Sequence, residues 1–393
     1  MGPAEDPPTE FRVTQPIPLP LDAWHRAHGG RMVAFAGYAL PVQYAPEGAL
    51  AARCRGGVLA EHLHCRAAAA LFDVSHMGQA ILAGAGAAAA LEALVTGDIA
   101  GLAPGRQRYT LLTNEAGGII DDLMAAALAP DRLLLVVNAA NKAGDFAHIA
   151  AALPEGVTLS PLPDRALLAL QGPRAAAALA RLCAAAVALP FQGIGHFPLL
   201  DTEALIARSG YTGEDGFELS IPAAAAVAVA DALLAEPEVA PAGLGARDSL
   251  RLEAGLCLHG ADIDASTDVI AAGLGWTIGK RRRAAWDFPG GARLRGLLQT
   301  GPARHRVGLR PEGRAPVRAG APILDPSGQA VGTVTSGLHS PSLAAPIAMG
   351  YVPAALAAPG TAVAPGTAVA LGLRGTPVPA RVTPLPFVPH RYA

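Results

Sequence analysis

The C-terminal part of the chain differs in composition from the rest, and this difference constrains the fold most. From about residue 303, proline and glycine recur every few residues between short β-branched runs, such as 331–335 and 378–382. Short strands separated by turn residues are typical of a small β-barrel or sandwich. The sequence therefore predicts a separate β domain, with a boundary near 285–303.

The residues before this boundary mix helical and strand-like segments without the regular alternation of a parallel α/β fold, which predicts an α+β class. At 393 residues the chain exceeds one ordinary hydrophobic core, so two or three domains are expected. Residues 133–137 and 166–170 are predicted to be buried strands. Residues 223–234 are predicted to be a helix, and so are residues 247–255, after a turn at 243–245.

Composition excludes several classes of protein. A hydrophobic fraction of 51% with 16% charged residues is that of a globular chain. A net charge of -2 gives no reason to expect nucleic acid or an anionic membrane as a partner. No apolar run has spanning length, no signal peptide is recognised, and the scattered cysteines fit a reducing compartment. We therefore expect a cytoplasmic protein, with a flexible tail at residues 1–15.

Two patterns imitate known sites. The Gly84-x-Gly86 turn after a strand is similar to a dinucleotide-binding loop, but the acidic residue expected about twenty positions later is missing. A strand-turn-helix corner is predicted instead. Residues 61–65 are dense in metal-ligand types, yet His62 and His64 would point to different faces of a helix. No metal site is expected there.

Glu218 interrupts an apolar strand-like run. A glycine-rich turn at 209–219 joins the runs 204–207 and 217–221, and the alternation of the second run places Glu218 opposite its two apolar neighbours. From these residues alone, Glu218 fits either a solvated hairpin or a carboxylate that points into a cleft.

Asp121 and Asp122 follow a glycine turn and continue into an apolar strand. In an extended strand they face opposite sides, so only one can point into a given pocket. A carboxylate beside Ile120 and Leu123 would have a raised pKa, which suits proton transfer or the stabilisation of a cation. A water-exposed aspartate at the end of a strand fits the pattern equally well.

Seven segments, in order along the chain from about residue 16 to the C-terminus, resemble the glycine cleavage T-protein family of tetrahydrofolate-dependent aminomethyltransferases. Each segment is weak evidence alone, but their shared order and separation are specific. The segments are residues 30–37, 72–78, 113–122, 170–173, 210–218, 243–253 and 335–337.

The resemblance implies three domains in a cloverleaf around a central folate channel, with a C-terminal β-barrel. We expect the first domain at 16–80 plus 163–270, the second at 81–162 plus 271–302, and the third at 303–393. The resemblance also implies that lipoylated H protein delivers an aminomethyl group. Tetrahydrofolate then accepts the carbon as 5,10-methylene-tetrahydrofolate, while ammonia and the dihydrolipoyl arm leave, and no metal is needed.

The resemblance further implies the site residues. Asp122 matches the family's catalytic aspartate, which positions and activates the folate nitrogens and would stabilise a developing cation. Glu218 is the expected pterin anchor, because a reduced pterin presents adjacent N–H donors that a carboxylate can accept as a fork. The other expected folate contacts are Tyr109, Asn138, Tyr211, Arg247 and Tyr392.

The chain departs from the family pattern at Ala261, where glutamine is usual, and at Val269, where proline is expected. The basic run 280–283 is denser than expected and is predicted to be a solvated loop. A weaker hypothesis is that this run attracts an acidic H protein or the glutamate tail of folate.

Two alternatives share the fold. Related enzymes transfer one-carbon units from methylated amines or sulfur compounds to tetrahydrofolate. A folate-binding iron–sulfur assembly factor has no transferase role and carries a Lys-Gly-Cys-Tyr motif. Here the nearby Cys257 lies in Leu-Cys-Leu-His, so that motif is absent.

Overall fold

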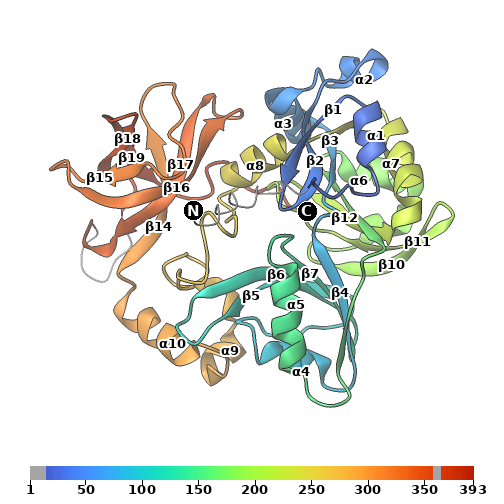
Figure 1. Cartoon of the computed structure of the whole chain (residues 1–393), viewed down its shortest axis with the longest axis horizontal. Helices are drawn as coiled ribbons and strands as arrows, with labels where there is room; N and C mark the ends of the chain where they lie inside the picture. Colours follow the sequence, from blue (N-terminus) through green and yellow to red (C-terminus); the bar gives the residue numbers. More distant parts are fainter. Residues whose placement is uncertain (1–14, 357–363) are drawn as a thin grey trace, which may run out of the picture.

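The computed structural model describes residues 15–356 and 364–393, so the expected tail at 1–15 lies almost wholly outside the described residues. Three lobes surround the middle of the molecule: two mixed lobes of helices and strands, and a barrel lobe formed by the C-terminal part of the chain (Figure 1). The expected α+β class with a C-terminal β-barrel is therefore confirmed.

The first lobe is built on a six-stranded sheet in the order β10-β11-β12-β9-β3-β13, in which only the β13–β3 pair is parallel. A hairpin of β1 and β2 lies beside this sheet. The strands are β1 (Gly30–Phe35), β2 (Tyr38–Tyr44), β3 (Ala69–Asp73), β9 (Arg165–Gln171), β10 (Ile194–Leu199), β11 (Thr202–Ala207), β12 (Gly216–Pro222) and β13 (Val239–Pro241).

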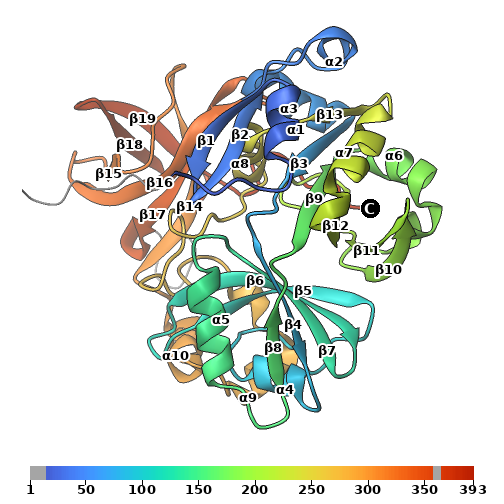
Figure 2. The same cartoon turned by 45° about the vertical axis from the view of Figure 1, so that its right-hand side comes forward.

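Helices cover both faces of this sheet (Figure 2), because its strands alternate buried side chains between two separate clusters. Leu71 packs toward α6 and α7, whereas Phe72 packs toward α3 and α8. The helices of this lobe are α1 (Asp22–Ala27), α2 (Gly48–Arg53), α3 (Gly57–Ala67), α6 (Ala175–Leu182), α7 (Ala226–Ala235) and α8 (Leu244–Glu253), with short 3-10 turns η1 (Ala184–Ala188) and η2 (Ala223–Ala225).

The predicted strand at 166–170 is confirmed as part of β9, and the predicted helix at 223–234 as η2 and α7. The turn expected at 243–245 is wrong, because α8 already begins at Leu244. The glycines there permit close packing. A Cβ on Gly243 would lie 2.5 Å from the carbonyl carbon of Val42, and one on Gly245 would lie 2.4 Å from a methyl of Val58.

The second lobe contains a five-stranded antiparallel sheet in the order β5-β6-β7-β4-β8. The strand predicted at 133–137 is confirmed as β7. The elements are β4 (Gly78–Ala83), α4 (Ala87–Glu92), β5 (Arg106–Thr113), β6 (Ile119–Ala129), β7 (Arg132–Val137), α5 (Lys142–Ala151), β8 (Thr158–Pro161), η3 (Gly275–Thr277), α9 (Lys280–Ala285) and α10 (Gly291–Thr300). Since β4 leads through Gly84 and Gly86 into α4 and pairs only with antiparallel strands, the predicted strand-turn-helix corner is confirmed.

One hydrophobic cluster joins β5 and β6 to the segment that follows α8. It includes Cys257 and Ile263, which lie before the expected boundary at residue 270, together with Phe288 and Leu294 beyond it. This hydrophobic cluster therefore does not mark residue 270 as a domain boundary. The proposed domain boundaries stay a prediction.

The basic run 280–283 is helix α9 rather than the predicted solvated loop, so that prediction is wrong. Arg282 is only 1% exposed and donates to the main-chain oxygens of Glu92 and Val95 and to the side chain of Asp287. Arg281 forms ion pairs with Glu92 and Asp98. These arginines hold α9 against α4. A local sequence pattern could not predict this contact, because the two helices are far apart in the sequence.

The third lobe is a closed barrel of strands in the order β14-β17-β16-β15-β18-β19. The runs at 331–335 and 378–382 lie in β16 and β19, as predicted. The strands are β14 (Arg304–Pro311), β15 (Pro322–Leu324), β16 (Ala330–Ser340), β17 (Ala345–Pro353), β18 (Ala368–Leu373) and β19 (Thr376–Thr383), with a 3-10 turn η4 (Ala354–Leu356).

A buried carboxylate, Glu253 at the end of α8, joins the first lobe to the barrel. It accepts hydrogen bonds from Arg66 at 2.9 Å and His62 at 3.0 Å, both on α3, and from Ser340 and Ser342 of the barrel. Burial alone would raise the pKa of Glu253, but the hydrogen bonds from His62, Ser340 and Ser342 lower it to about 2. The carboxylate is therefore ionised and fully surrounded by donors.

We predict that Glu253→Gln lowers the free energy of unfolding at pH 7 by about 3–5 kcal/mol, because it removes one of the two buried carboxylates that pair with the Arg66 cation. The folded-state pKa of Glu253 is depressed, so its stabilisation is present above the unfolded value of about 4.3. It is lost as the pH falls toward about 2. Urea unfolding between pH 7 and pH 2 should show a shallower acid loss in the variant.

The matched control is Asp22→Asn, which removes the surface ion pair with Arg26 on α1. This change should leave both the urea midpoint at pH 7 and its acid dependence as in the unsubstituted protein. Equal effects of the two substitutions would contradict the structural role given to Glu253.

Candidate active site

Asp122 lies on β6, the strand between β5 and β7. It is paired in register with Leu111, so its diagonal neighbour on the same face of β5 is Tyr109. Burial, followed by the charge of Asp122, raises the pKa of the Tyr109 hydroxyl, so the two groups lie near each other. Asn138, the first residue after β7, donates from Nδ2 to Asp122 Oδ1 at 2.7 Å. Three adjacent strands therefore place three of the predicted site residues together.

The environment of Asp122 favours its protonated form more than water does. Burial and the negative charge of Asp121 raise the pKa of Asp122 to about 6, although Tyr109, His259 and Asn138 act in the opposite direction. This value lies close to neutral pH, where one carboxyl group can exist in either protonation state.

Asp121 lies on the buried side of β6 and is fully covered, while Asp122 is half-buried. The two aspartates therefore face opposite sides of the strand, as predicted, and they differ in solvent exposure. The Asn138 amide nevertheless reaches both, since Nδ2 lies 2.8 Å from Asp121 Oδ1 as well as 2.7 Å from Asp122 Oδ1. The two aspartates are thus neighbours of one amide, a contact that strand alternation alone does not predict.

Glu218 lies on β12, with Phe217 and Leu219 in the core of the first lobe. The predicted orientation away from these two neighbours is confirmed. Glu218 Oε2 accepts a hydrogen bond from the Ser209 hydroxyl at 2.6 Å. The two predicted runs lie in β11 and β12, and residues 208–215 form the loop that joins these strands.

The loop 208–215 also carries Tyr211. The Tyr211 hydroxyl donates to the main-chain oxygen of Cys257, and the Arg247 guanidinium lies 4.6 Å above the Tyr211 ring. Burial is the largest cause that lowers the pKa of Arg247 and raises that of Tyr211. Within the described residues, the Arg247 guanidinium makes no hydrogen bond, so its donors remain available to a ligand.

The same loop is held from outside by buried acids that looked like ordinary turn residues in the sequence. Glu214 is 1% exposed and forms ion pairs with Arg66 at 2.8 Å and with Arg391. Asp215 pairs with Arg208 at 2.7 Å. These contacts fix the loop that carries Ser209 and Tyr211.

The charge of Asp122 acts to raise the pKa of Tyr211, and the charge of Glu218 acts to raise that of Arg247. Contacts or charge effects thus link five of the predicted residues, from β5, β6, the position after β7, the 208–215 loop and α8, and Arg247 is further linked to Glu218 on β12. The group is Tyr109, Asp122, Asn138, Tyr211 and Arg247.

Tyr392 is the predicted residue whose contacts lie apart from this group. Its ring stacks on Phe191 at 4.4 Å and lies 4.9 Å from the ring of His390. The adjacent Arg391 pairs with Glu214 of the 208–215 loop. The role of Tyr392 at the channel stays a prediction.

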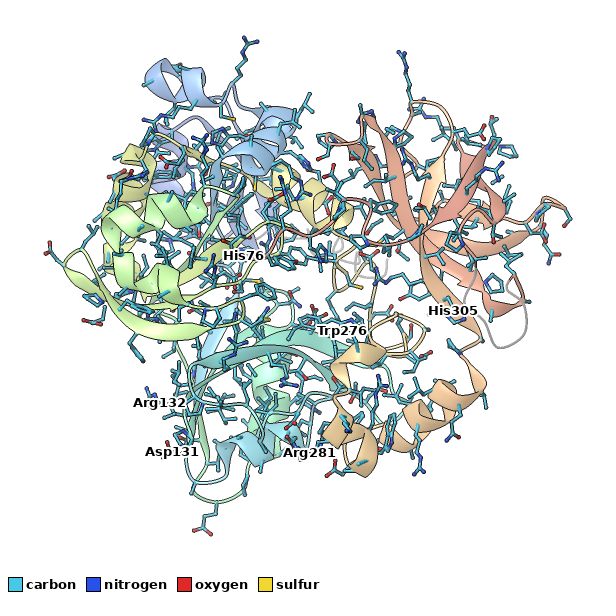
Figure 3. All side chains as sticks on the ribbon, turned by 180° about the vertical axis from the view of Figure 1, so that it is seen from behind. His76, Asp131, Arg132, Trp276, Arg281 and His305 are labelled. Carbon is cyan, nitrogen blue, oxygen red and sulfur yellow. The ribbon has the colours of Figure 1, made fainter. Side chains whose placement is uncertain are left out.

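Trp276 was not singled out by sequence reasoning. It lies in η3, is 64% exposed, and stacks on Tyr109 with a ring separation of 5.7 Å. Figure 3 shows Trp276 and His76 toward the middle of the molecule, where the lobes meet, whereas Arg281 lies on the outer side of the second lobe. The sequence gives no reason to single out Trp276, because a lone tryptophan after a glycine occurs in many loops.

Two surface hollows of the described residues lie elsewhere. One, on the barrel, has an empty volume of about 490 Å³ and is lined by residues that include Arg304, Thr335 and Tyr351. The other is lined by residues 286–293 with Ala93 and Glu115. Neither includes a predicted site residue, so the side chains themselves define the candidate site.

The described residues contain no group of three or more histidine, cysteine or acidic side chains arranged to hold a metal ion. His62 and His64 bond to different partners, Ser249 and the Glu238 carbonyl. Among the described helices, none has both the length and the apolar character needed to span a membrane.

Sequence and structure comparisons give the same family over nearly the whole chain. Residues 21–282 match the GCVT N-terminal domain, and residues 304–389 match the glycine cleavage T-protein C-terminal barrel domain. The chain is 49% identical over 382 residues to a mitochondrial aminomethyltransferase from Gallus gallus, covering 95% of this chain and 93% of that protein. It is 46% identical over 381 residues to the mitochondrial aminomethyltransferase of Homo sapiens, covering 95% and 90%.

A crystal structure of the glycine cleavage system aminomethyltransferase T from Bartonella henselae has the same fold. It superimposes with a TM-score of 0.86 at 44% identity, covering 95% of this chain and 99% of that one. Together with the two matched domains, these similarities show that the chain belongs to the glycine cleavage T-protein family of aminomethyltransferases.

Proposed function

We propose that this chain moves the aminomethyl carbon from the lipoyl arm of H protein to tetrahydrofolate in glycine cleavage. The products are 5,10-methylene-tetrahydrofolate, ammonia and the dihydrolipoyl form of H protein. Family membership supports a folate-dependent aminomethyltransferase. The observation that carries the assignment to this site is the half-buried Asp122, held by Tyr109 and Asn138, with a pKa of about 6.

The residues present fit a reduced folate. Glu218 accepts one hydrogen bond from Ser209 at 2.6 Å, which leaves its other oxygen able to accept from the pterin. The nearby Arg247 has free donors over Tyr211, which suits a carbonyl oxygen or a carboxylate of the ligand. Tyr109 and the exposed Trp276 offer stacked rings beside Asp122, a surface on which an aromatic ring can lie.

When bound, tetrahydrofolate supplies the nitrogen nucleophiles that accept the carbon. Glu218 makes the same bonds before and after transfer, so it contributes to binding and orientation. Asp122, when ionised, places a negative charge beside the carbon that becomes cationic, and its carboxylate can take a proton from an attacking nitrogen. Tyr109 and Asn138 hold the carboxylate in place for this step. Tyr211 and Arg247 position the ligand between the two carboxylates, and we propose that Tyr392 closes the site.

The partner and the location complete the proposal. We infer that lipoylated H protein is the donor, because the glycine cleavage T-protein family works in that system. The cytoplasmic location expected from the sequence is a proposal only, since the chicken and human relatives are named as mitochondrial enzymes.

The proposal is tested by mixing purified protein, aminomethylated H protein and tetrahydrofolate, and by measuring ammonia and methylene-tetrahydrofolate. Stoichiometric formation of both products is expected. A parallel reaction replaces the carrier with a methylated amine or a sulfonium donor. Turnover of that donor, with none of the carrier, would overturn the proposal in favour of a related demethylase.

We predict that Asp122→Asn lowers kcat by about 10²–10⁴-fold while tetrahydrofolate still binds, because the amide keeps the shape but not the charge or the basicity. In the unsubstituted enzyme, kcat/KM should fall tenfold per pH unit below about pH 6, as Asp122 becomes protonated. Stopped-flow rates between pH 5 and pH 8 measure both effects. An acid limb that persists unchanged in the variant would contradict the role of Asp122.

Glu218→Gln is predicted to weaken tetrahydrofolate binding by about ten- to hundredfold, which corresponds to about 1.5–3 kcal/mol for a hydrogen bond to a charged group. At saturating folate, kcat should stay within about threefold of the original value. The control is Glu203→Gln, an exposed position on β11 of the same sheet. Calorimetric titration with folate separates the two variants, and equal affinities would argue against the anchor.

A further inference from the structure

Behind Asp122 lies a second carboxylate with an unusually complete set of donors. Asp121 is fully buried, and its Oδ1 accepts hydrogen bonds from the side-chain amides of Asn138 and Asn141, each at 2.8 Å. Its Oδ2 accepts from the main-chain N–H of Asn138 at 3.2 Å. Because a carboxylate can only accept, Asp121 fixes which way both amides point.

The side chains of Asn138 and Asn141 also contact residues of the candidate site. Asn138 directs its NH₂ group toward Asp122 as well as toward Asp121. Asn141 Nδ2 also lies 2.9 Å from His259 Nδ1, and His259 Nε2 lies 3.3 Å from the main-chain oxygen of Ile119. Asp121 Oδ1 itself lies 3.7 Å from His259 Nδ1. The imidazole ring is therefore held beside Asp121.

Asp145 completes the group from the helix side. It lies on α5, one turn after Asn141, and is only 1% exposed. Its carboxyl group is hydrogen bonded to that of Asp121, and its Oδ2 has no partner within the described residues. Two carboxyl groups can share a hydrogen bond only when one of them holds a proton. N–H donors of Asn138 and Asn141 already face both oxygens of Asp121, so the proton of the shared hydrogen bond is assigned to Asp145. Burial, followed by this hydrogen bond, also raises the pKa of Asp145, to about 9.

We propose that Asp145, Asp121 and His259 are positioning residues for the transfer reaction: protonated Asp145 donates to Asp121, and Asp121 orients Asn138 so that its amide donates to Asp122. The inference rests on the proposed function of Asp122. It adds that the carboxylate of Asp121, which accepts from both asparagine amides, raises the pKa of Asp122 in addition to the effect of burial.

The groups that face this cluster come from every element packed against it. Asp122 is faced by Tyr109 on β5, by Tyr211 on the 208–215 loop, and by Cys257 and His259 on the segment after α8. Of the charged groups, Asp121 acts to raise the pKa of Asp122 and His259 acts to lower it, and the effect of Asp121 is the larger of the two.

The test is a ¹³C NMR titration of the aspartate carboxyl carbons in the intact protein, with kcat/KM profiles recorded in parallel. The signals of Asp122 and Asp145 are assigned by their loss in Asp122→Asn and Asp145→Asn. We expect midpoints near pH 6 and near pH 9. Asp145→Asn keeps a donor to Asp121, so it should leave the titration midpoint of Asp122 in place and retain at least about a third of kcat. Asp145→Ala removes that donor and should lower kcat about tenfold or more.

Asp121→Asn should move the Asp122 midpoint and the acid limb of kcat/KM to lower pH, and should lower kcat about a hundredfold because Asn138 loses its acceptor. The control is Asp131→Asn, an exposed position at the far end of the second lobe (Figure 3), which should change neither. The inference is overturned if Asp145 titrates below pH 6, or if Asp145→Asn lowers the Asp122 midpoint as far as Asp121→Asn does. It is also overturned if Asp121→Asn leaves the midpoint unchanged. The NMR result holds whichever donor the enzyme uses, so it is separate from the test of the proposed function.

Discussion

A carboxylate removed from water is stable only when hydrogen-bond donors surround it, and the structure depends on this constraint at two places. Glu253 collects donors from α3 and from the barrel, so the first and third lobes must keep one relative position. Asp121 collects donors from two asparagines that follow β7. The first carboxylate fixes contacts between lobes, and the second fixes the amide that holds Asp122.

The two carboxylates of the candidate site belong to different lobes. Glu218 belongs to the sheet of the first lobe, whose core encloses its apolar neighbours, and it is suited to holding a ligand without taking part in bond changes. Asp122 belongs to the sheet of the second lobe, where burial and a neighbouring charge bring its pKa to about 6. The Tyr211 ring, which contacts Arg247, is affected by the charge of Asp122, and Arg247 by that of Glu218. A ligand that contacts both carboxylates must therefore bridge the two lobes, which fits an extended molecule such as a folate.

Local patterns predicted the features that depend on neighbours in sequence. The alternation around Glu218 gave its orientation, and the spacing of prolines and glycines after residue 303 indicated the barrel. Contacts between distant segments could not be predicted in this way. Arg282 is buried because Glu92 lies beside it, although 190 positions separate them. Asp145 sits in a helix of ordinary composition, and only the fold brings it to Asp121. The family resemblance supplied Asp122 and its partners, but not the acid behind them.

The central claim is that Glu218 holds the folate while Asp122 acts on it. A crystal structure of the protein with tetrahydrofolate bound tests this most directly. The account predicts that the pterin N–H groups donate to the Glu218 carboxylate and that a reacting folate nitrogen lies within hydrogen-bonding distance of Asp122. A folate bound with its pterin away from Glu218, or with no nitrogen near Asp122, would contradict the account.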